Sequence, residues 1–150
     1  MNNIVKKLPD ILSKIDALYI SDKFIDVVSE QSCDCDELVI KNGDFYIKLT
    51  SHAINEEDGY IAFETLEYFN ENTYPYEVVL TNTDFVFDRL QFISNNYVEG
   101  IRFKYKEEYL FIFALDTNLV ITKSKADLFD DATDYTVYEK EATLTITRRL

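Results

Sequence analysis

Carboxylates are the side chains in this sequence whose number and grouping could do chemistry. The forty positions 49–88 contain nine acidic residues and no lysine or arginine. The wider stretch 24–88 holds fifteen acidic residues and two basic ones, Lys41 and Lys48, so its net charge of −13 equals that of the whole chain. Charge segregated in this way acts on binding partners more than on the fold.

Residues for nucleophilic or metal-dependent catalysis are scarce. His52 is the only histidine, so a Ser-His-Asp or Cys-His arrangement has a single candidate base, and a loop histidine is the simpler interpretation. Three glycines cannot form a Gly-x-Gly-x-x-Gly or Walker loop, which argues against dinucleotide and P-loop NTPase chemistry. The adjacent Glu56, Glu57 and Asp58 lack the spacing of a calcium-binding loop. We therefore expect no catalytic residue, no cofactor and no metal.

Two smaller groups of residues have ordinary structural interpretations. Cys33 and Cys35 are expected to be reduced, because a disulfide framework or a metal site would need further cysteines or histidines. Arg102, Lys104 and Lys106 alternate with apolar residues and would project from one face of a strand. Such a stripe can hold phosphates, but cross-strand pairing with acidic residues is the interpretation we favour.

The elements that must position these residues begin with predicted helices. Pro9 can open a helix whose apolar residues recur at helical spacing as far as Tyr19. Asp22 can cap a second short helix over 23–29, and an acidic loop over 33–37 follows. Residues 83–96 favour a helix, although their phenylalanines fit a strand equally well. Ser124–Phe129 resembles a helical turn with Asp127 in the capping-box position.

Strands account for most of the remaining chain. The clearest local signal is Asn42-Gly43 between two apolar runs, which predicts a hairpin with a type I′ turn. Strict alternation over 101–106 predicts a half-buried antiparallel strand, and the apolar run 109–115 a strand buried on both faces. Further strands are predicted over 60–69, 76–81 and 119–122, with a closing hairpin over 135–138 and 143–148.

The fold expected from this pattern is α+β. One or two N-terminal helices would pack on a largely antiparallel sheet of about seven to nine strands. A length of 150 residues indicates a single domain over residues 1–150. No apolar stretch approaches the roughly 20 residues of a membrane span, and residues 1–7 lack the apolar run of a signal peptide. We therefore expect a cytoplasmic protein.

The acidic stretch also carries tyrosines, and tyrosines among acidic residues are typical of binding surfaces. We expect a non-enzymatic protein that occludes the cationic site of a basic partner, such as a toxin, a nuclease or another nucleic-acid-binding protein. An immunity protein and an antidefence protein that mimics nucleic acid both fit. The net charge argues against direct contact with nucleic acid or anionic membranes. The residues expected to bind the partner are Glu56, Glu57, Asp58, Tyr60, Glu64, Glu67, Tyr68, Glu71, Tyr74, Tyr76 and Glu77.

Alternative functions remain open at this stage. The acidic stretch can be a solvated surface that keeps the protein soluble, and the chain can be a self-associating structural or adaptor domain. A carboxylate-based enzyme or small-ligand binder, with a cavity lined by tyrosine and phenylalanine, is a further alternative.

Overall fold

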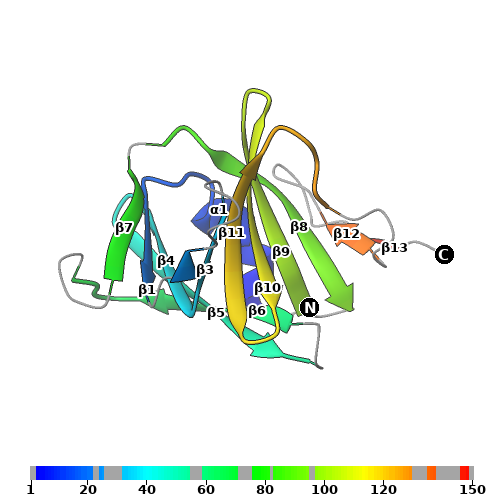
Figure 1. Ribbon diagram of the computed structural model, residues 1–150, viewed down its shortest axis with the longest axis horizontal. Coiled ribbons are helices and arrows are strands. Elements are labelled where there is room, and N and C mark those ends of the chain that lie inside the picture. Colours follow the sequence, from blue (N-terminus) through cyan, green and yellow to red (C-terminus); the bar gives the residue numbers. More distant parts are fainter. Residues whose placement is uncertain are drawn as a thin grey trace.

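In its computed structural model the described part of the protein is mostly β, with one short helix and two antiparallel sheets (Figure 1). The helix α1 (Asn3–Ile11) comes first in the chain. The structure describes residues 3–21, 24–25, 32–54, 59–70, 76–81, 83–94, 97–129, 135–137 and 146–148, and it describes side chains for 7–21, 34–54, 59–70, 81, 83–92 and 97–129.

The first sheet has five strands in the order β6-β5-β4-β1-β7. Each neighbouring pair is antiparallel, so β6 and β7 are the two edge strands. The bounds of these strands are β1 (Ala17–Ser21), β4 (Glu37–Asn42), β5 (Phe45–Ala53), β6 (Gly59–Leu66) and β7 (Tyr76–Thr81).

The second sheet has eight strands in the order β13-β12-β8-β9-β10-β11-β3-β2, again antiparallel throughout. The long strands β8 to β11 form its centre (Figure 1). The bounds are β2 (Phe24–Ile25), β3 (Ser32–Cys35), β8 (Val86–Ser94), β9 (Tyr97–Tyr105), β10 (Glu108–Leu115), β11 (Asn118–Ser124), β12 (Tyr135–Val137) and β13 (Ile146–Arg148).

The chain passes between the two sheets at a shared corner. Only Asp36 separates β3 of the eight-stranded sheet from β4 of the five-stranded sheet. The backbone N–H of Asp36 donates to the carbonyl of Ser21, the last residue of β1. Strands that switch sheets at a bend are the usual way in which two packed sheets form a corner.

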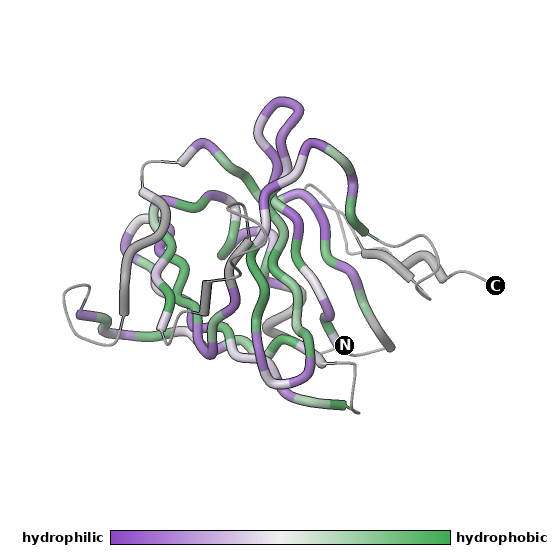
Figure 2. Tube along the Cα trace, in the orientation of Figure 1, coloured by the Kyte–Doolittle hydropathy of each residue, from purple (hydrophilic) through white to green (hydrophobic). Residues whose placement is uncertain are grey.

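One hydrophobic core lies between the two sheets and includes α1. Leu8 and Leu12 join it from the helical end, and both are fully buried. The green runs along the central strands in Figure 2 mark the sheet residues that meet there. Cys35 is buried within this core, which agrees with the structural role predicted for it. The side chain of Cys33 lies outside the described residues.

Two-residue turns close three hairpins, and each turn begins with a positive φ. Gly43 has a φ of 59° between β4 and β5. Lys106 has a φ of 55° between β9 and β10, and Asp116 has 54° between β10 and β11. This conformation suits glycine and is strained for lysine.

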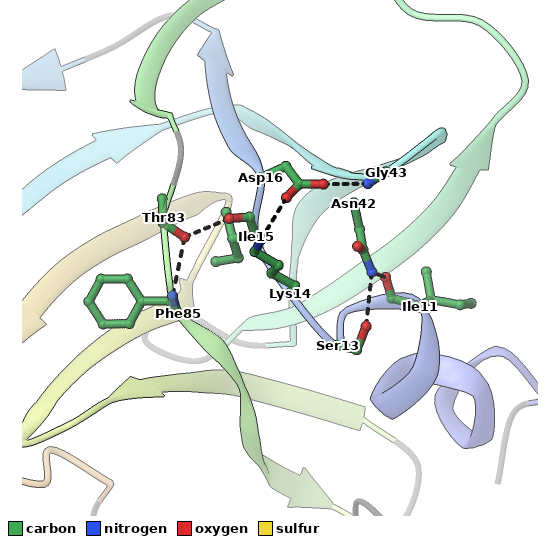
Figure 3. Close-up of polar contacts among 9 residues, drawn as sticks. All are labelled: Ile11, Ser13, Lys14, Ile15, Asp16, Asn42, Gly43, Thr83 and Phe85. Carbon is green, nitrogen blue, oxygen red and sulfur yellow. Dashed lines mark hydrogen bonds and ion pairs between the residues drawn. The ribbon is translucent and has the colours of Figure 1, made fainter.

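The hairpin predicted from Asn42-Gly43 is confirmed, but its turn is shifted by one residue and is not of type I′, because only the first of its two central residues has a positive φ. Asn42 pairs with Phe45 inside the ladder, so the turn begins at Gly43. The N–H of Gly43 donates to Asp16 Oδ2 at 2.5 Å, so this turn is held by the segment before β1 (Figure 3).

Side-chain hydrogen bonds tie the chain between α1 and β1 to both sheets (Figure 3). Asn42 Nδ2 donates to the carbonyl of Ile11 at 2.8 Å, which satisfies a carbonyl at the end of the helix. From the other side, Thr83 Oγ1 donates to the carbonyl of Ile15 at 2.5 Å. The asparagine of the turn motif therefore holds α1 rather than forming the turn itself.

The helix predicted from Pro9 to Tyr19 is wrong. Pro9 lies inside α1, which ends two residues later at Ile11. Leu18 and Tyr19 belong to β1, which pairs with β4 on one side and β7 on the other and is buried along its whole length. Apolar residues of a strand buried on both faces mimic helical spacing, so the sequence pattern alone could not separate the two.

The helix favoured over residues 83–96 is also wrong, because Val86–Ser94 form β8. Its pairing with β9 shifts register between Phe87 and Arg89, which makes Asp88 an extra residue in the ladder. This β-bulge separates the buried Phe87 and Leu90 by three positions. The strand that the phenylalanines also allowed is therefore the correct interpretation, and the bulge interrupts its alternation.

Three smaller predictions differ as well. Phe24–Ile25, within the second predicted helix, form β2, and most of the expected loop over 33–37 is strand. Ser124 ends β11, and no helical turn follows it in the described residues. Ser124 Oγ accepts from Ala126 N–H, and Asp127 Oδ1 accepts from Phe129 N–H, each at 3.0 Å. Both are turn contacts to the second residue along, unlike a capping box.

The other predicted strands are confirmed with small changes of bounds. Residues 60–69 give β6, which ends at Leu66, and 76–81 give β7. Residues 101–106, 109–115 and 119–122 correspond to β9, β10 and β11, and β12 pairs with β13 as the closing hairpin. The α+β class itself is wrong. In the described part of the chain there is one nine-residue helix, and the strands form two packed sheets in place of one.

Candidate partner-binding surface

The outer side of the five-stranded sheet carries Glu64 and Glu67 of the acidic stretch, whereas Asp88 at the end of the stretch lies on the other sheet. Strand register sets which residues point outward: His52 pairs with Tyr60, Lys48 with Glu64, and Tyr46 with Leu66. We call this outer side, together with residues 67–70 that follow β6, the five-strand face.

The eleven residues predicted to bind a partner divide into three groups. Tyr60, Glu64, Glu67 and Tyr68 lie on the five-strand face. Tyr76 and Glu77 lie in β7 at the opposite edge of the same sheet, where the structure describes only the backbone. The remaining five, Glu56, Glu57, Asp58, Glu71 and Tyr74, lie outside the described residues.

Phe69 fixes the chain that leaves β6. Its ring packs on Tyr19 of β1 at 5.2 Å and on Tyr46 of β5 at 5.4 Å between ring centroids. Since β4 lies between β5 and β1, Phe69 sits over the middle of the sheet. Tyr19, Val39 and Ala17 form with these rings a second, smaller hydrophobic cluster.

Because the ring of Phe69 packs against the sheet, the side chain of the preceding residue, Tyr68, points away from the sheet. Tyr68 is 78% exposed, the most exposed large hydrophobic residue that the structure describes. Glu67 beside it is also exposed. An extended chain anchored at one residue presents the preceding side chain to solvent. Glu67 and Tyr68 are therefore held outward on a fixed backbone.

Both basic residues of the stretch 24–88 lie on this same face. Lys48 Nζ is 3.4 Å from Glu64, whose side chain is 63% exposed. Lys41 Nζ lies over the ring of Tyr46 at 5.8 Å. The Lys48–Glu64 pair is a cross-strand surface pair of the kind that contributes about 0.2–1 kcal/mol. Glu64 is thus partly neutralised, whereas Glu67 makes no ion pair among the described residues.

An aromatic stack marks the end of the five-strand face that meets the other sheet. His52 stacks on Tyr60 with 5.4 Å between ring centroids, and Tyr60 contacts Tyr97 of β9 at 4.5 Å. His52 Nε2 is also 3.2 Å from Thr50 Oγ1. The single histidine is therefore an exposed strand residue in β5, and its contacts are those of a surface aromatic rather than a catalytic base.

The outer side of the eight-stranded sheet buries charge in place of exposing it. Arg102 of β9 is only 6% exposed. Its guanidinium donates through Nε and Nη2 to Asp88 Oδ2 and through Nη1 to Asp127 Oδ2 at 2.8 Å. The rings of Tyr109 and Phe129 lie 4.7 and 5.5 Å from its central carbon. The predicted pairing of Arg102 with acidic residues is confirmed, and this residue is no part of an open phosphate-binding stripe.

Two β-bulges create this charged environment. The register shift at Asp88 places an extra residue in β8, and a second shift near Phe92 leaves Glu99 as an extra residue in β9. A bulge re-aims a side chain that would otherwise follow the alternation of the strand. Asp88 thereby reaches Arg102, and Glu99 Oε1 accepts from Gln91 Nε2. We call Asp88, Arg89, Gln91, Glu99, Arg102 and Asp127 the bulge cluster.

Asp127 closes the bulge cluster from the segment after β11. Partial burial would raise the pKa of its carboxyl group, but the hydrogen bond from Phe129 N–H and the charge of Arg102 outweigh burial and lower the pKa below 3.8. Arg89 adds to this effect through its charge. Asp127 is therefore ionised at neutral pH and completes the pairing of Arg102.

Sequence reasoning missed the bulge cluster because its members come from three separate places in the chain, β8, β9 and the segment after β11. Asp88 and Arg89 were the end of the acidic stretch and the start of the next segment, and Asp127 was assigned to a helical cap. The available signal was the interruption of the strand pattern near Phe87, which was interpreted as a helix.

The described residues also bear on metal binding and on membrane insertion. Among the described residues, no three histidine, cysteine or acidic side chains gather in a way that could hold a metal ion. Within the same residues, no helix has the length and apolar character needed to cross a membrane. Comparison of the chain with protein-family models, with curated proteins and with solved structures found no match.

Proposed function

We propose that this protein is a non-enzymatic binding protein that occludes the cationic site of a basic partner in the cytoplasm. The observation that carries the proposal is Tyr68, a large ring that is 78% exposed beside the exposed Glu67. Phe69 anchors the backbone, so Tyr68 loses little freedom on binding. Exposed, preorganised tyrosines flanked by charge are typical energetic centres of protein interfaces.

Charge supports the same partner chemistry. Between Lys48 and Arg89 the sequence contains no lysine or arginine, so its carboxylates add a negative field to the five-strand face, which Lys41 and Lys48 offset in part. Such a field mainly raises the rate of association and depends on ionic strength. A toxin, a nuclease or another nucleic-acid-binding protein offers the complementary cationic groove.

Binding to a panel of basic nucleases, measured by calorimetry at several salt concentrations, tests the proposal. We expect one member to bind with an affinity that falls as salt increases. Tyr68→Ala should weaken that binding by about 2 kcal/mol, as at an interface hot spot. Glu67→Gln should reduce the association rate and the salt dependence. Glu107→Gln in the β9–β10 turn is the matched control, since it removes an exposed acid far along the chain from this face.

The outcome for Tyr68 and Glu67 decides the proposal. Unchanged binding in both variants would remove the five-strand face from consideration. Binding that is equally weakened by Glu107→Gln would show that net charge matters and the face does not.

Self-association is the second candidate function, and one observation favours it. β7 is the last strand of the five-stranded sheet, and among the described strands it pairs with β1 alone. A free strand edge can accept a strand of a second copy. Sedimentation at several concentrations separates the two functions: a dimer that persists in Tyr68→Ala supports the structural role, and a monomer supports the proposal above.

A further inference from the structure

The two sheets end in four edge strands in the described part of the chain, and β6 is the longest of them. Unpaired strand edges invite pairing with other chains, and proteins normally protect them with short strands, bulges, proline or lysine. The eight-stranded sheet ends in β2, which has two residues, and β13, which has three. At the other edge of the five-stranded sheet, β7 pairs with β1 through a register shift and so carries an extra residue.

β6 has none of these protective features. Its eight residues pair with β5 in one continuous register, and they include no proline, lysine or arginine. In an antiparallel pair, the N–H and C=O groups of successive residues point alternately toward the partner strand and away from it. Every second residue of β6 therefore turns a donor and an acceptor away from β5, and no described strand pairs with these groups.

The first residues of β6 are closed off by the other sheet. Tyr60 contacts Tyr97 of β9 with 4.5 Å between ring centroids. A Cβ added at Gly59 would lie 2.5 Å from the carbonyl oxygen of Asp116 in the β10–β11 turn. The open part of the edge therefore begins after these residues.

Residues 62–66 make up the open part of the edge. Glu64 and Thr65 are exposed, in contrast to the buried Ile61. The chain that follows β6 does not return along the edge, because Phe69 packs over the middle of the sheet. A short extended segment can therefore lie beside β6 at this point.

The two sides of this edge favour different side chains in an added strand. Glu64 pairs with Lys48 on the outer side and is 63% exposed, so a basic residue opposite it on an added strand is favourable. On the inner side, Phe63 pairs with Leu49 and packs against the core, yet it is only partly buried. An apolar residue beside Phe63 would remove more of its ring from water. The edge therefore matches a segment in which basic and apolar residues alternate.

Charge argues against a second copy of the chain as the occupant. Antiparallel pairing of two β6 strands would place both Glu64 side chains on one face of the joined sheet, where like charges are destabilising. The net charge of −13 adds a general repulsion between copies. A basic segment reverses both effects.

We propose that residues 62–66 of β6 bind an extended segment of the basic partner as an added strand, and that basic and apolar residues alternate in this segment. Main-chain hydrogen bonds then supply affinity, and the alternating side chains supply specificity. The inference rests on the proposed function for the kind of protein that carries the segment. It is distinct from the Tyr68 contact because it depends on the backbone of β6.

A short peptide of alternating lysine and valine, titrated into the full chain and followed by NMR, tests the proposal. We expect backbone amides of alternate residues within 62–66 to shift and to exchange more slowly with solvent. The same peptide methylated at every backbone nitrogen keeps its charge but cannot donate, so it should bind about tenfold more weakly or worse. A peptide of alternating glutamate and valine should not bind.

A variant of the edge provides the second test. Thr65 pairs with the core-facing Ile47, so Thr65→Lys places a charge against the apolar side of an added strand. It should weaken binding of the lysine–valine peptide about tenfold or more, and it should fold normally because Thr65 is exposed. Thr117→Lys makes the same change at an exposed residue of the β10–β11 turn and is the matched control.

Four results would overturn the proposal. They are equal binding of the methylated peptide, equal binding of the glutamate peptide, an absence of added protection at residues 62–66, and unchanged binding in Thr65→Lys. Slow exchange of the same amides without any peptide, together with a dimer in sedimentation, would identify a second copy as the occupant and would also overturn it.

The same variants separate this inference from the proposed function. A basic nuclease whose binding falls in Tyr68→Ala but not in Thr65→Lys would overturn strand addition and leave the proposed function intact. Strand addition by the peptide, with no nuclease of the panel bound, would support the β6 edge and count against the proposed function.

Discussion

The outer faces of the two sheets are each covered by one phenylalanine, yet they treat charge in opposite ways. Phe69 covers tyrosines and aliphatic residues on the five-strand face, and the charged residues around it stay in solvent. Phe129 covers Phe111 on the other sheet at 5.4 Å, and Arg102 is buried beneath it, paired with the largely buried Asp88 and the partly exposed Asp127. The difference teaches that charge next to a covering ring stays accessible to solvent on one face and holds the fold together on the other.

Removal of the buried Arg102 cation should reduce the stability of the fold more than any other change. Arg102→Ala leaves Asp88 and Asp127 without their common partner, and breaking a buried ion pair from one side costs about 3–5 kcal/mol. Urea denaturation measures the loss. Lys48→Ala on the five-strand face is the control, with an expected loss below about 1 kcal/mol. Equal losses in the two variants would contradict the distinction between the faces.

Truncation of the covering rings should come next. Phe129 is 6% exposed and also packs on Phe113 at 5.8 Å, so Phe129→Ala should cost about 3 kcal/mol. Phe69 is only half-buried, so Phe69→Ala should cost about half as much. In the double variant with Arg102→Ala, Phe129→Ala should show coupling and Phe69→Ala should be additive. Coupling of Phe69 with Arg102 would show that the two faces are not independent.

The pH dependence of Asp127 should give a smaller effect. The folded state lowers the pKa of Asp127 below 3.8, so its ionised form stabilises the fold above that pH, and this contribution is lost as the pH falls through the folded-state pKa. Asp127→Asn should therefore lose about 1 kcal/mol at neutral pH. The difference from the parent protein should shrink in strong acid. A difference that grows with acid would show that Asp127 is not held as an anion.

Substitutions in the hairpin turns should change stability least, and the two substitutions should act in opposite directions. Lys106 occupies a positive φ in the eight-stranded sheet, where Asn is tolerated better, so Lys106→Asn should gain about 0.5 kcal/mol. Gly43 occupies the same conformation in the five-stranded sheet, so Gly43→Ala should lose about 1 kcal/mol. Thermal denaturation measures the change in stability of each of the two variants. A loss in Lys106→Asn would show that the contact of Lys106 with the Tyr105 ring outweighs strain.

The sequence was most informative where turn chemistry and alternation agreed. Asn42-Gly43 located the first hairpin, and the run 109–115 located β10. It was least informative where a strand is buried on both sides or carries a bulge. Leu18 and Tyr19 lie in β1, which is buried along its length, and a bulge at Asp88 interrupts the alternation of β8, and helices were predicted over both segments. The consequence was an α+β prediction for a two-sheet fold.

The candidate sites were predictable to different degrees. Exposure of Glu67 and Tyr68 follows from local polarity, and the sequence identified both. Their anchor was not predictable, because the predicted strand ran to residue 69, whereas the strand ends at Leu66 and Phe69 packs on the outside of the sheet. The bulge cluster depends on two register shifts, and a register is set by the pairing partner rather than by the strand alone.

The order of strands has a consequence for how the molecule is made. Ala17 must meet Thr81, and Cys35 must meet Leu119, before either sheet closes, so the native pairings join distant parts of the chain. Domains dominated by such pairings fold in milliseconds to seconds, with strand edges uncovered meanwhile. Thirteen surplus negative charges make unfinished copies repel one another during that interval. The same anions that can attract a partner to the folded protein therefore also reduce association between copies of the chain while it folds.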